Sequence, residues 1–326
     1  MSSYVRQAFL TRGRGRGVSR SFPTCHIPNS PNLRAPKKGS SSSTSTTRRL
    51  EVQKPKPTSI TPPGRLNLPQ WREIWRSREV AVRMAQRDII VRYRQTIFGI
   101  SWVLLQPLVT AGVFTIVFGV IAGLDSDGIP TFVFTLAAML AWNLFNGAVS
   151  QASTSMVSNQ SLVQKVFFPR LIVPASSVVS IVVDFLVSLT LLVALLFIFG
   201  INPGWPILLL PVWVLLILML GLGLGLMAAA YLVKYRDVGY VLPWVLQVLM
   251  YASPLAYSLN AVPQNIRWFF EANPITWFLE VFRWSTLGAE APPSWQFIAL
   301  IVAAPAVLFL GILVFQKNER EFADYI

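Results

Sequence analysis

Arginines recur through residues 71–94 at a spacing that gives them a shared chemistry. On a helix of about 100° per residue, five of them fall within roughly 60° of one another. The five are Arg72, Arg76, Arg83, Arg87 and Arg94. Trp75, Ala85, Ile89 and Tyr93 occupy a separate apolar face. This pattern predicts an amphipathic helix in the headgroup plane of a membrane, where its positive charge attracts anionic lipids. The alternative, a surface helix on a soluble domain, lacks a soluble domain to pack on.

Asp184 is the only carboxylate that falls deep inside an apolar segment. A charge at such a position indicates a functional or structural role, because leaving it unpaired in hydrocarbon costs free energy. We expect Asp184 to bond a backbone or hydroxyl group, with a proton relay as the alternative. No carboxylate pair, Ser/His set or metal-binding cluster accompanies it, so the sequence indicates a protein that is not an enzyme.

The sequence contains no phosphate-binding loop of the Gly-x-x-x-x-Gly-Lys-Ser/Thr type. The run GLGLGLM at 221–227 lies inside an apolar segment and predicts a helix-packing surface. The lone cysteine and histidine, Cys25 and His26, are neighbours in a Pro/Ser/Arg-rich tail that has no scaffold to hold them. We therefore expect no cofactor on this chain. If it moves a substrate uphill, ATP and Mg²⁺ bind to another subunit.

Composition places the chain in the membrane class. Of its 326 residues, 53% are hydrophobic and 13% are charged, and the mean hydropathy is +0.53. Soluble domains carry about a quarter charged residues. The net charge of +14 might point to nucleic acid, but 20 of the 28 Lys and Arg residues precede Thr96 and no recognition module accompanies them. A basic flank beside an apolar body fits an anionic membrane surface, so we expect no nucleic-acid partner.

Six apolar segments are long enough to span a bilayer, which needs about 20 residues. They are residues 97–121, 131–155, 173–199, 206–232, 240–258 and 295–316. The connection 156–172 carries Lys165 and Arg170, the connection 233–239 carries Lys234 and Arg236, and the C-terminal tail is also basic. Because basic loops remain in the cytoplasm, both termini are predicted to be cytoplasmic.

Two segments fall outside these spans. Residues 1–66 are rich in Ser, Pro and Arg, so they predict a disordered basic extension. An organelle transit peptide and a start codon assigned too early are alternative readings of it. Residues 259–294 are aromatic yet too charged to cross, which predicts one or two short re-entrant helices before the last span.

Five segments in a fixed order resemble the permease subunit of bacterial ABC-type polysaccharide exporters, which transport O-antigen, capsule and teichoic acid chains. They are DIIVRYRQTIFGISWVLLQPL, KVFFPRLIVPASSVVSIVVDF, KYRDVGYVLP with ASPLAYS, NPITWFLEVFR, and FQKNEREFADYI. The resemblance covers about residues 70–326. It implies an all-α membrane domain over 67–326 with six spans, in a homodimer bound to two ATP-binding cassette ATPase subunits.

The resemblance also implies roles for particular residues. The helix 71–94 corresponds to an interfacial gate helix that carries Arg72, Arg76, Arg83, Arg87, Arg92 and Arg94. The loop 156–172 corresponds to the coupling element that docks on the ATPase, with Gln164, Lys165, Phe168, Pro169 and Arg170; a plain connector is the alternative. Phe98, Trp102 and Gln106 are candidates for the glycan pathway, although Trp102 could equally anchor the interface. Asp184, Arg236, Asp237 and Arg283 are candidate structural charges, and we expect Arg283 to pair with Glu280 or Glu271.

The sequence therefore predicts the membrane subunit of an ATP-driven exporter of a lipid-linked polysaccharide, in the plasma (inner) membrane of a bacterium. The first alternative is the same fold exporting a drug or a lipid. A membrane glycosyl- or acyltransferase would need more catalytic groups than Asp184, and a passive channel would need no ATPase.

Overall fold

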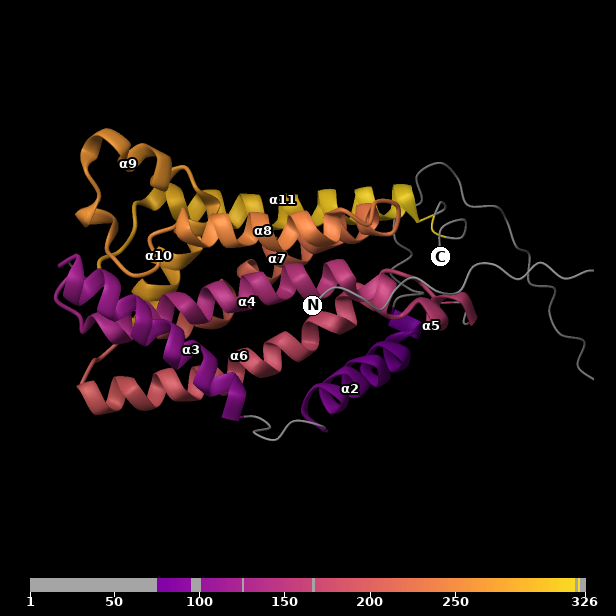
Figure 1. The fold of residues 1–326 in the computed structure, drawn as a ribbon, viewed down its shortest axis with the longest axis horizontal. Helices are drawn as coiled ribbons and strands as arrows, with labels where there is room; N and C mark the ends of the chain where they lie inside the picture. The colour runs from indigo at the N-terminus through magenta and orange to yellow at the C-terminus, as the bar shows by residue number, and fades with distance from the viewer. Residues whose placement is uncertain (1–74, 95–100, 125, 166–167, 320–321, 323–326) are drawn as a thin grey trace, which may run out of the picture. The chain divides into compact units, whose positions relative to one another are not determined.

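The computed structural model describes residues 75–94, 101–124, 126–165, 168–319 and 322. The predicted extension 1–66, Arg72 and Phe98 lie outside these residues. The described part is helical and contains no strand, in agreement with the predicted all-α class (Figure 1). In chain order the elements are α2 (Arg78–Arg94), α3 (Ser101–Phe114), the π-helix η1 (Thr115–Ile121), α4 (Thr131–Ser158), α5 (Gln160–Lys165), α6 (Ile172–Phe199), the 3-10 helix η2 (Trp205–Leu209), α7 (Leu210–Leu232), α8 (Val238–Tyr251), the 3-10 helix η3 (Leu259–Ala261), α9 (Gln264–Glu271), α10 (Pro274–Leu287) and α11 (Ser294–Asn318).

Five helices are long and apolar enough to cross a membrane. They are Ser101–Ile121, Thr131–Ser158, Ile172–Phe199, Trp205–Leu232 and Ser294–Asn318. Each corresponds to one of the predicted spans. Local signals end some of the helices sharply. For example, α6 stops at Gly200, which takes the left-handed conformation (φ 66°) that suits a glycine C-cap.

The predicted fifth span, 240–258, is helical only in its first part. Its helix, α8, has 14 residues, or about 21 Å at 1.5 Å per residue, against a hydrocarbon core of roughly 30 Å. Pro254 accounts for the early end, because the residue before a proline avoids helical backbone. The count of six full-length spanning helices is therefore not confirmed. Residues 259–294 do form short helices, α9 and α10; their depth in a membrane remains a prediction.

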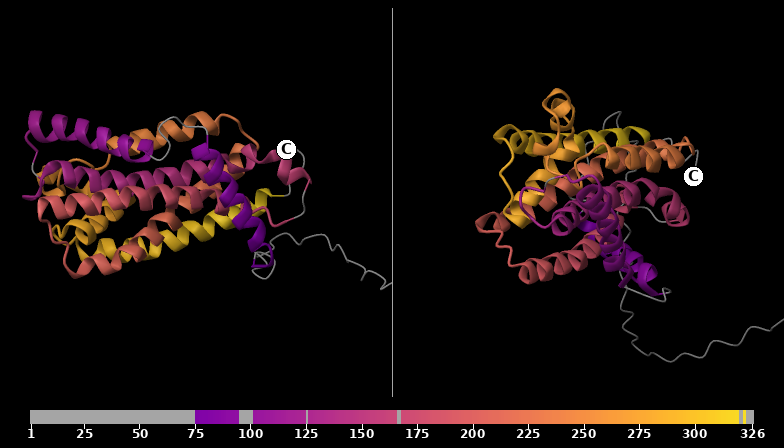
Figure 2. Two further views of the ribbon diagram at one scale, coloured as in Figure 1. Left: turned by 90° about the horizontal axis from the view of Figure 1, so that it is seen from below. Right: turned by 60° about the vertical axis from the view of Figure 1, so that its left-hand side comes forward.

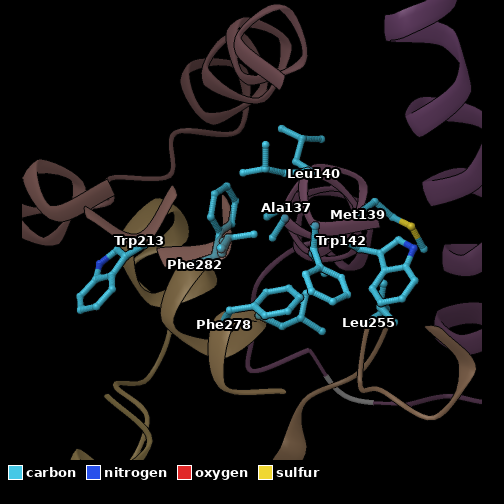
Figure 3. Close-up of a cluster of buried hydrophobic side chains, with 14 of the residues drawn as sticks. Ala137, Met139, Leu140, Trp142, Trp213, Leu255, Phe278 and Phe282 are labelled. Atoms are coloured by element: carbon cyan, nitrogen blue, oxygen red, sulfur yellow. The ribbon is translucent and has the colours of Figure 1, made fainter. Parts of the chain in front are cut away.

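Helix α4 is the centre of the bundle and packs against α7, α6, α10 and α3. On one side, Phe145 packs against Phe278 of α10 with ring centroids 5.3 Å apart and the ring planes tilted by 38°. Figure 3 shows Phe278 and Phe282 of α10 beside Ala137 and Trp142 of α4. On the other side, α4 meets α7 through small residues. A Cβ added to Gly225 would lie 2.6 Å from the Cβ of Ala152.

The glycine run of α7 is thus the helix-packing surface that the sequence predicted. A Cβ on Gly223 would lie 2.7 Å from the backbone of Leu308 in α11, so α7 approaches α4 and α11 closely. Small residues in the second half of α4, including Ala148, Ala152 and Ser155, are buried in the same way. These contacts fix the bundle on which the candidate site is built.

The bundle has two distinct ends (Figure 1). Helix α5, the C-terminal end of α11 and part of α2 lie at one end, whereas α9 and α10 lie at the other. In a second view α2 crosses the bundle obliquely near the α5 end (Figure 2). The basic connections that follow α4 and α7 and the end of α11 therefore meet at one end.

Candidate functional site

Helix α2 is attached to the bundle by a small apolar contact. Met84 and Ala85 are buried, and Met84 packs in a cluster with Met156, Val173 and Phe315. Other apolar residues of α2 remain exposed. They are Val82, Ile90 and Val91, and Trp75, just before the helix, is exposed as well. A helix with exposed apolar and basic residues beside one buried strip suits a membrane interface.

The arginines of α2 have different partners. Arg83, Arg87, Arg92 and Arg94 are all exposed, and so is Arg76, which lies just before the helix. The Nη2 atom of Arg87 contacts Asp88 at 2.7 Å and also donates to Oδ1 of Asn159, at the end of α4. Arg92 lies off the basic stripe, and its Nη2 atom is 2.8 Å from Oδ2 of Asp184. Arg87 and Arg92 therefore connect α2 to the bundle, although the sequence pattern had placed Arg87 on the stripe that faces lipid headgroups.

Asp184 of α6 receives one donor on each carboxylate oxygen. The Tyr93 hydroxyl donates to Oδ1, and Arg92 reaches Oδ2. Burial, and then the hydrogen bond to Asp184, raise the pKa of Tyr93 to about 12, so the hydroxyl keeps its proton near neutral pH. A backbone or hydroxyl partner was expected for Asp184, and the Tyr93 hydroxyl is that partner. Arg92 is a second partner, which was not expected. Sequence reasoning placed Tyr93 only on the apolar face, and no local signal joins it to a residue 91 positions away.

The α4–α6 connection begins with α5 and ends at Arg170. Leu162, Val163 and Phe168 pack on the cluster that holds Met84, and Gln164 is exposed. The side chain of Lys165 lies outside the described residues. Pro169 is partly buried and its carbonyl accepts from the Ile172 amide at 3.0 Å, at the start of α6.

Arg170 joins this connection to the end of α11. Its Nη1 atom donates to the carbonyl of Glu319 at 2.6 Å, and its Nε atom lies 4.0 Å from Oε1 of the same residue. Burial raises the pKa of the Glu319 carboxyl, and the charge of Arg170 opposes that rise. The connection is consequently attached to the bundle at both of its ends.

Trp102 and Gln106 of α3 are both exposed and lie one turn apart on one face. Val109 and Val113 continue the exposed stripe. An amide on a lipid-facing surface carries a cost of several kcal/mol when unpaired. The exposed position of Gln106 therefore favours a face of α3 that another subunit covers or that borders water, rather than one that faces lipid.

Pro107, inside α3, is tolerated because a neighbouring helix supplies the hydrogen bond that the proline cannot donate. Its missing N–H leaves the carbonyl of Val103 without the usual helical donor. The Ser188 hydroxyl of α6 donates to that carbonyl at 3.4 Å. The buried Pro107 therefore packs toward the bundle while Gln106 faces away from it.

Of the other candidate charges, Arg283 is buried and the pair Arg236 and Asp237 is exposed. Arg236 and Asp237 lie at the α7–α8 turn, and no ion pair involves them within the described residues. Arg283 is only 1% exposed. It donates to the carbonyls of Pro254 and Leu255 at 2.7 and 2.6 Å.

Arg283 also pairs with Glu280 at 3.2 Å, and its guanidinium carbon lies 3.9 Å from the Phe134 ring centroid. Glu271, the other partner that we considered, pairs with Arg267 instead. Arg283 thus attaches the turn after α8 to α10. In the described part of the chain, no group of three or more His, Cys, Asp or Glu residues gathers to hold a metal.

Together these features define a multi-pass helical membrane protein whose basic helix α2 is connected to the helical core. Residues 80–287 match the family described as ABC-2 type transporter, and the chain belongs to that family. A relative in Myxococcus xanthus, named O-antigen export system permease protein RfbA, is 27% identical over 257 residues, which are 78% of this chain and 98% of the relative. A protein of the same name in Klebsiella pneumoniae is 22% identical over 254 residues, which are 76% and 95% of the two chains.

Proposed function

We propose that this chain is the membrane subunit of an ATP-driven exporter that moves a lipid-linked polysaccharide of the O-antigen class across the plasma membrane of a bacterium. The match to O-antigen export permeases over nearly their whole length carries this proposal. Membership of the ABC-2 type transporter family supports the transport reaction and a partner that carries the ATP-binding cassette.

The arrangement of charge supports an orientation with both termini in the cytoplasm. The α4–α6 connection, the α7–α8 turn and the end of α11 all carry Lys or Arg, and they lie at one end of the bundle (Figure 1). The α9–α10 end faces outward in this orientation. Helix α8 and the segment that follows it then complete a sixth passage, although the helix itself is short.

The α4–α6 connection is the proposed docking element for the ATPase. It lies at the cytoplasmic end, presents exposed residues such as Ser161 and Gln164, and is attached to α2 and α11. ATP and Mg²⁺ would be held by that subunit, which supplies the hydrolysis.

A second copy of the chain completes the proposed passage. The face of α3 with Trp102 and Gln106 is exposed, and so is an aromatic face of α8 with Tyr240, Trp244 and Tyr251. Aromatic rings and an amide on surfaces of a spanning bundle suit contacts with sugar rings and hydroxyls. In a homodimer these faces would border a path for the glycan.

The exposed arginines of α2 place positive charge on the side from which the substrate would enter the transporter. Arg83 and Arg94 remain exposed, with neither in an ion pair among the described residues. At the headgroup level they would attract the phosphate of a lipid-linked substrate or an anionic lipid.

The proposal is tested by co-expressing the chain with an ATP-binding cassette subunit from the same organism. We expect a stable complex whose ATPase activity accompanies the appearance of labelled glycan at the cell surface. Lys165→Glu with Arg170→Glu should release the ATPase or uncouple hydrolysis. Lys234→Glu with Arg236→Glu makes the same charge change on another cytoplasmic turn and serves as the control. ATP hydrolysis by the purified chain alone would contradict the proposal.

A further inference from the structure

Asn159 joins two helices at the point where α2 touches them. Its side-chain amide donates to the Ser155 carbonyl at 2.9 Å and so belongs to the end of α4. Its backbone carbonyl accepts from the backbone amides of Leu162 and Val163, in the first turn of α5, at 3.0 and 3.1 Å. Asn159 is 8% exposed. Any tilt of α5 must therefore move Asn159.

Arg87 is held in position to follow that movement. Its Nε and Nη2 atoms both contact Oδ1 of Asp88, at 3.1 and 2.7 Å, which limits the rotation of the guanidinium. The same Nη2 atom donates to Oδ1 of Asn159. The neighbouring Arg83 lies on the same basic stripe and is exposed without a bond to α4 or α5 in the described residues.

The C-terminal end of α2 is attached elsewhere. Arg92 and Tyr93 bind Asp184 of α6, so that end is fixed to the bundle. The helix is thus bound to α6 through Asp184 at its C-terminal end and, five residues before Arg92, to the joint between α4 and α5 through Arg87. The apolar contact of Met84 with the core lies on the other side of Arg87. Because these attachments are to different elements, a movement of the joint changes the tilt of α2 relative to α6.

We propose that the Arg87–Asn159 contact mechanically links the docking element to the interfacial helix, with the Asp184 attachment as its pivot. This rests on the proposed function, in which α5 contacts the ATPase. A movement imposed on α5 by nucleotide binding is transmitted through Asn159 to Arg87 and tilts α2 at the headgroup level. Arg87 and Asn159 are positioning residues, since neither needs to touch the substrate.

Two variants of Asn159 separate this link from the capping of α4. Both Asn159→Ala and Asn159→Asp remove the amide donor to Ser155, but only Asn159→Asp keeps an acceptor for Arg87. We expect Asn159→Ala and Arg87→Ala to lower the glycan exported per ATP hydrolysed by about fivefold, the scale of an ordinary coupling between sites. Asn159→Asp should restore the ratio. The control Arg236→Ala removes an exposed arginine of the α7–α8 turn, outside α2, and should leave the ratio near wild type.

The movement itself is measured with spin labels on the assembled transporter. Cys25→Ser removes the native thiol, and labels are placed at the exposed positions Gln86→Cys on α2, beside Arg87, and Ser161→Cys on α5. Without the Asn159 change, the distance between the labels should stay constant between nucleotide-free and ATP-bound complexes. In Asn159→Ala it should change with nucleotide, because α5 then moves without α2.

The possible results distinguish the link from the proposed function. A wild-type distance that changes with nucleotide, or an Asn159→Ala complex that matches Asn159→Asp in both measurements, would overturn the link while leaving the exporter intact. Failure of the wild-type chain to bind an ATPase or export glycan would instead remove the proposed function.

Discussion

Helices α4 and α3 are both apolar and adjacent in the chain, yet they occupy opposite environments. In the most apolar 18 residues of each, 78% of the α4 residues are buried, compared with 11% for α3 together with the π-helix η1 that follows it. The more buried helix is the one with more hydroxyl and small residues, such as Ala148, Ala152 and Ser155. Close packing between helices uses small side chains, whereas contact with lipid or a second subunit uses larger apolar ones.

The largest effect on stability is expected when a buried charge is removed. Arg283→Met removes the guanidinium that binds the carbonyls of Pro254 and Leu255 and leaves Glu280 without its partner. We expect a loss of about 3–5 kcal/mol in the free energy of unfolding, the usual cost of breaking a buried pair. Thermal unfolding of the purified protein in detergent measures it.

Arg267→Met is the matched control. Arg267 pairs with Glu271 at 2.8 Å, but both side chains are about one-third exposed. The expected loss is about 0–1 kcal/mol, because solvent screens the pair. Equal shifts in the midpoint for both variants would contradict the distinction between the interior and the surface.

Glycine positions sharpen the comparison between the α4 and α3 surroundings. Gly225→Ala places a Cβ 2.6 Å from that of Ala152, so α7 and α4 must separate. We expect a loss of about 1–3 kcal/mol. Gly112→Ala on α3 meets nothing within 4 Å and should be neutral or stabilising by up to about 1 kcal/mol. Unfolding curves recorded under one detergent condition decide the sign, and a destabilised Gly112→Ala protein would mean that α3 is packed more tightly than it appears.

The attachment of α2 should contribute less. Tyr93→Phe removes the donor to Asp184 and should cost about 1 kcal/mol, seen as faster hydrogen exchange over Arg78–Arg94. Tyr240→Phe, at a residue 82% exposed, is the control.

The pH dependence of this attachment has a definite sign. Because folding raises the pKa of Tyr93 from 10.0 to about 12, its contribution is complete below pH 10 and is lost as the pH rises toward 12. Protection over α2, measured relative to the base-catalysed exchange of an unfolded chain at each pH, should stay constant between pH 7 and 9. A loss of protection already in that range would argue against a protonated Tyr93 at the contact.

The smallest effect is expected on the exposed face of α3. Gln106→Leu should change the stability of the isolated subunit by no more than about 0.5 kcal/mol, since the side chain is exposed. If this face borders a passage in a dimer, the same variant should lower export in the assembled transporter. A neutral result in both assays would assign the face to lipid and break the proposed passage.

The sequence by itself determined the membrane class, the helical character, the positions of five spans and the packing role of the α7 glycines. These follow from local patterns of hydropathy, helical period and small residues, which act over a few turns. It also predicted that Asp184 bonds a backbone or hydroxyl group, without identifying Tyr93. The length of α8 was misjudged because an apolar run does not reveal where the helix within it ends. The helix ends before the Ser253–Pro254 step, and Arg283 binds the carbonyls of Pro254 and Leu255 that follow it.

Only the tertiary structure decided which arginines of α2 serve the protein and which remain exposed. The Arg87–Asn159 contact joins residues 72 positions apart, the Tyr93–Asp184 contact 91, and the Ser188 hydroxyl that compensates for Pro107 comes from another helix. A basic residue has the same local pattern whether it faces phosphate or a carboxylate on a neighbouring helix. Its partner is set by how the helices cross, and that depends on packing summed over the whole bundle.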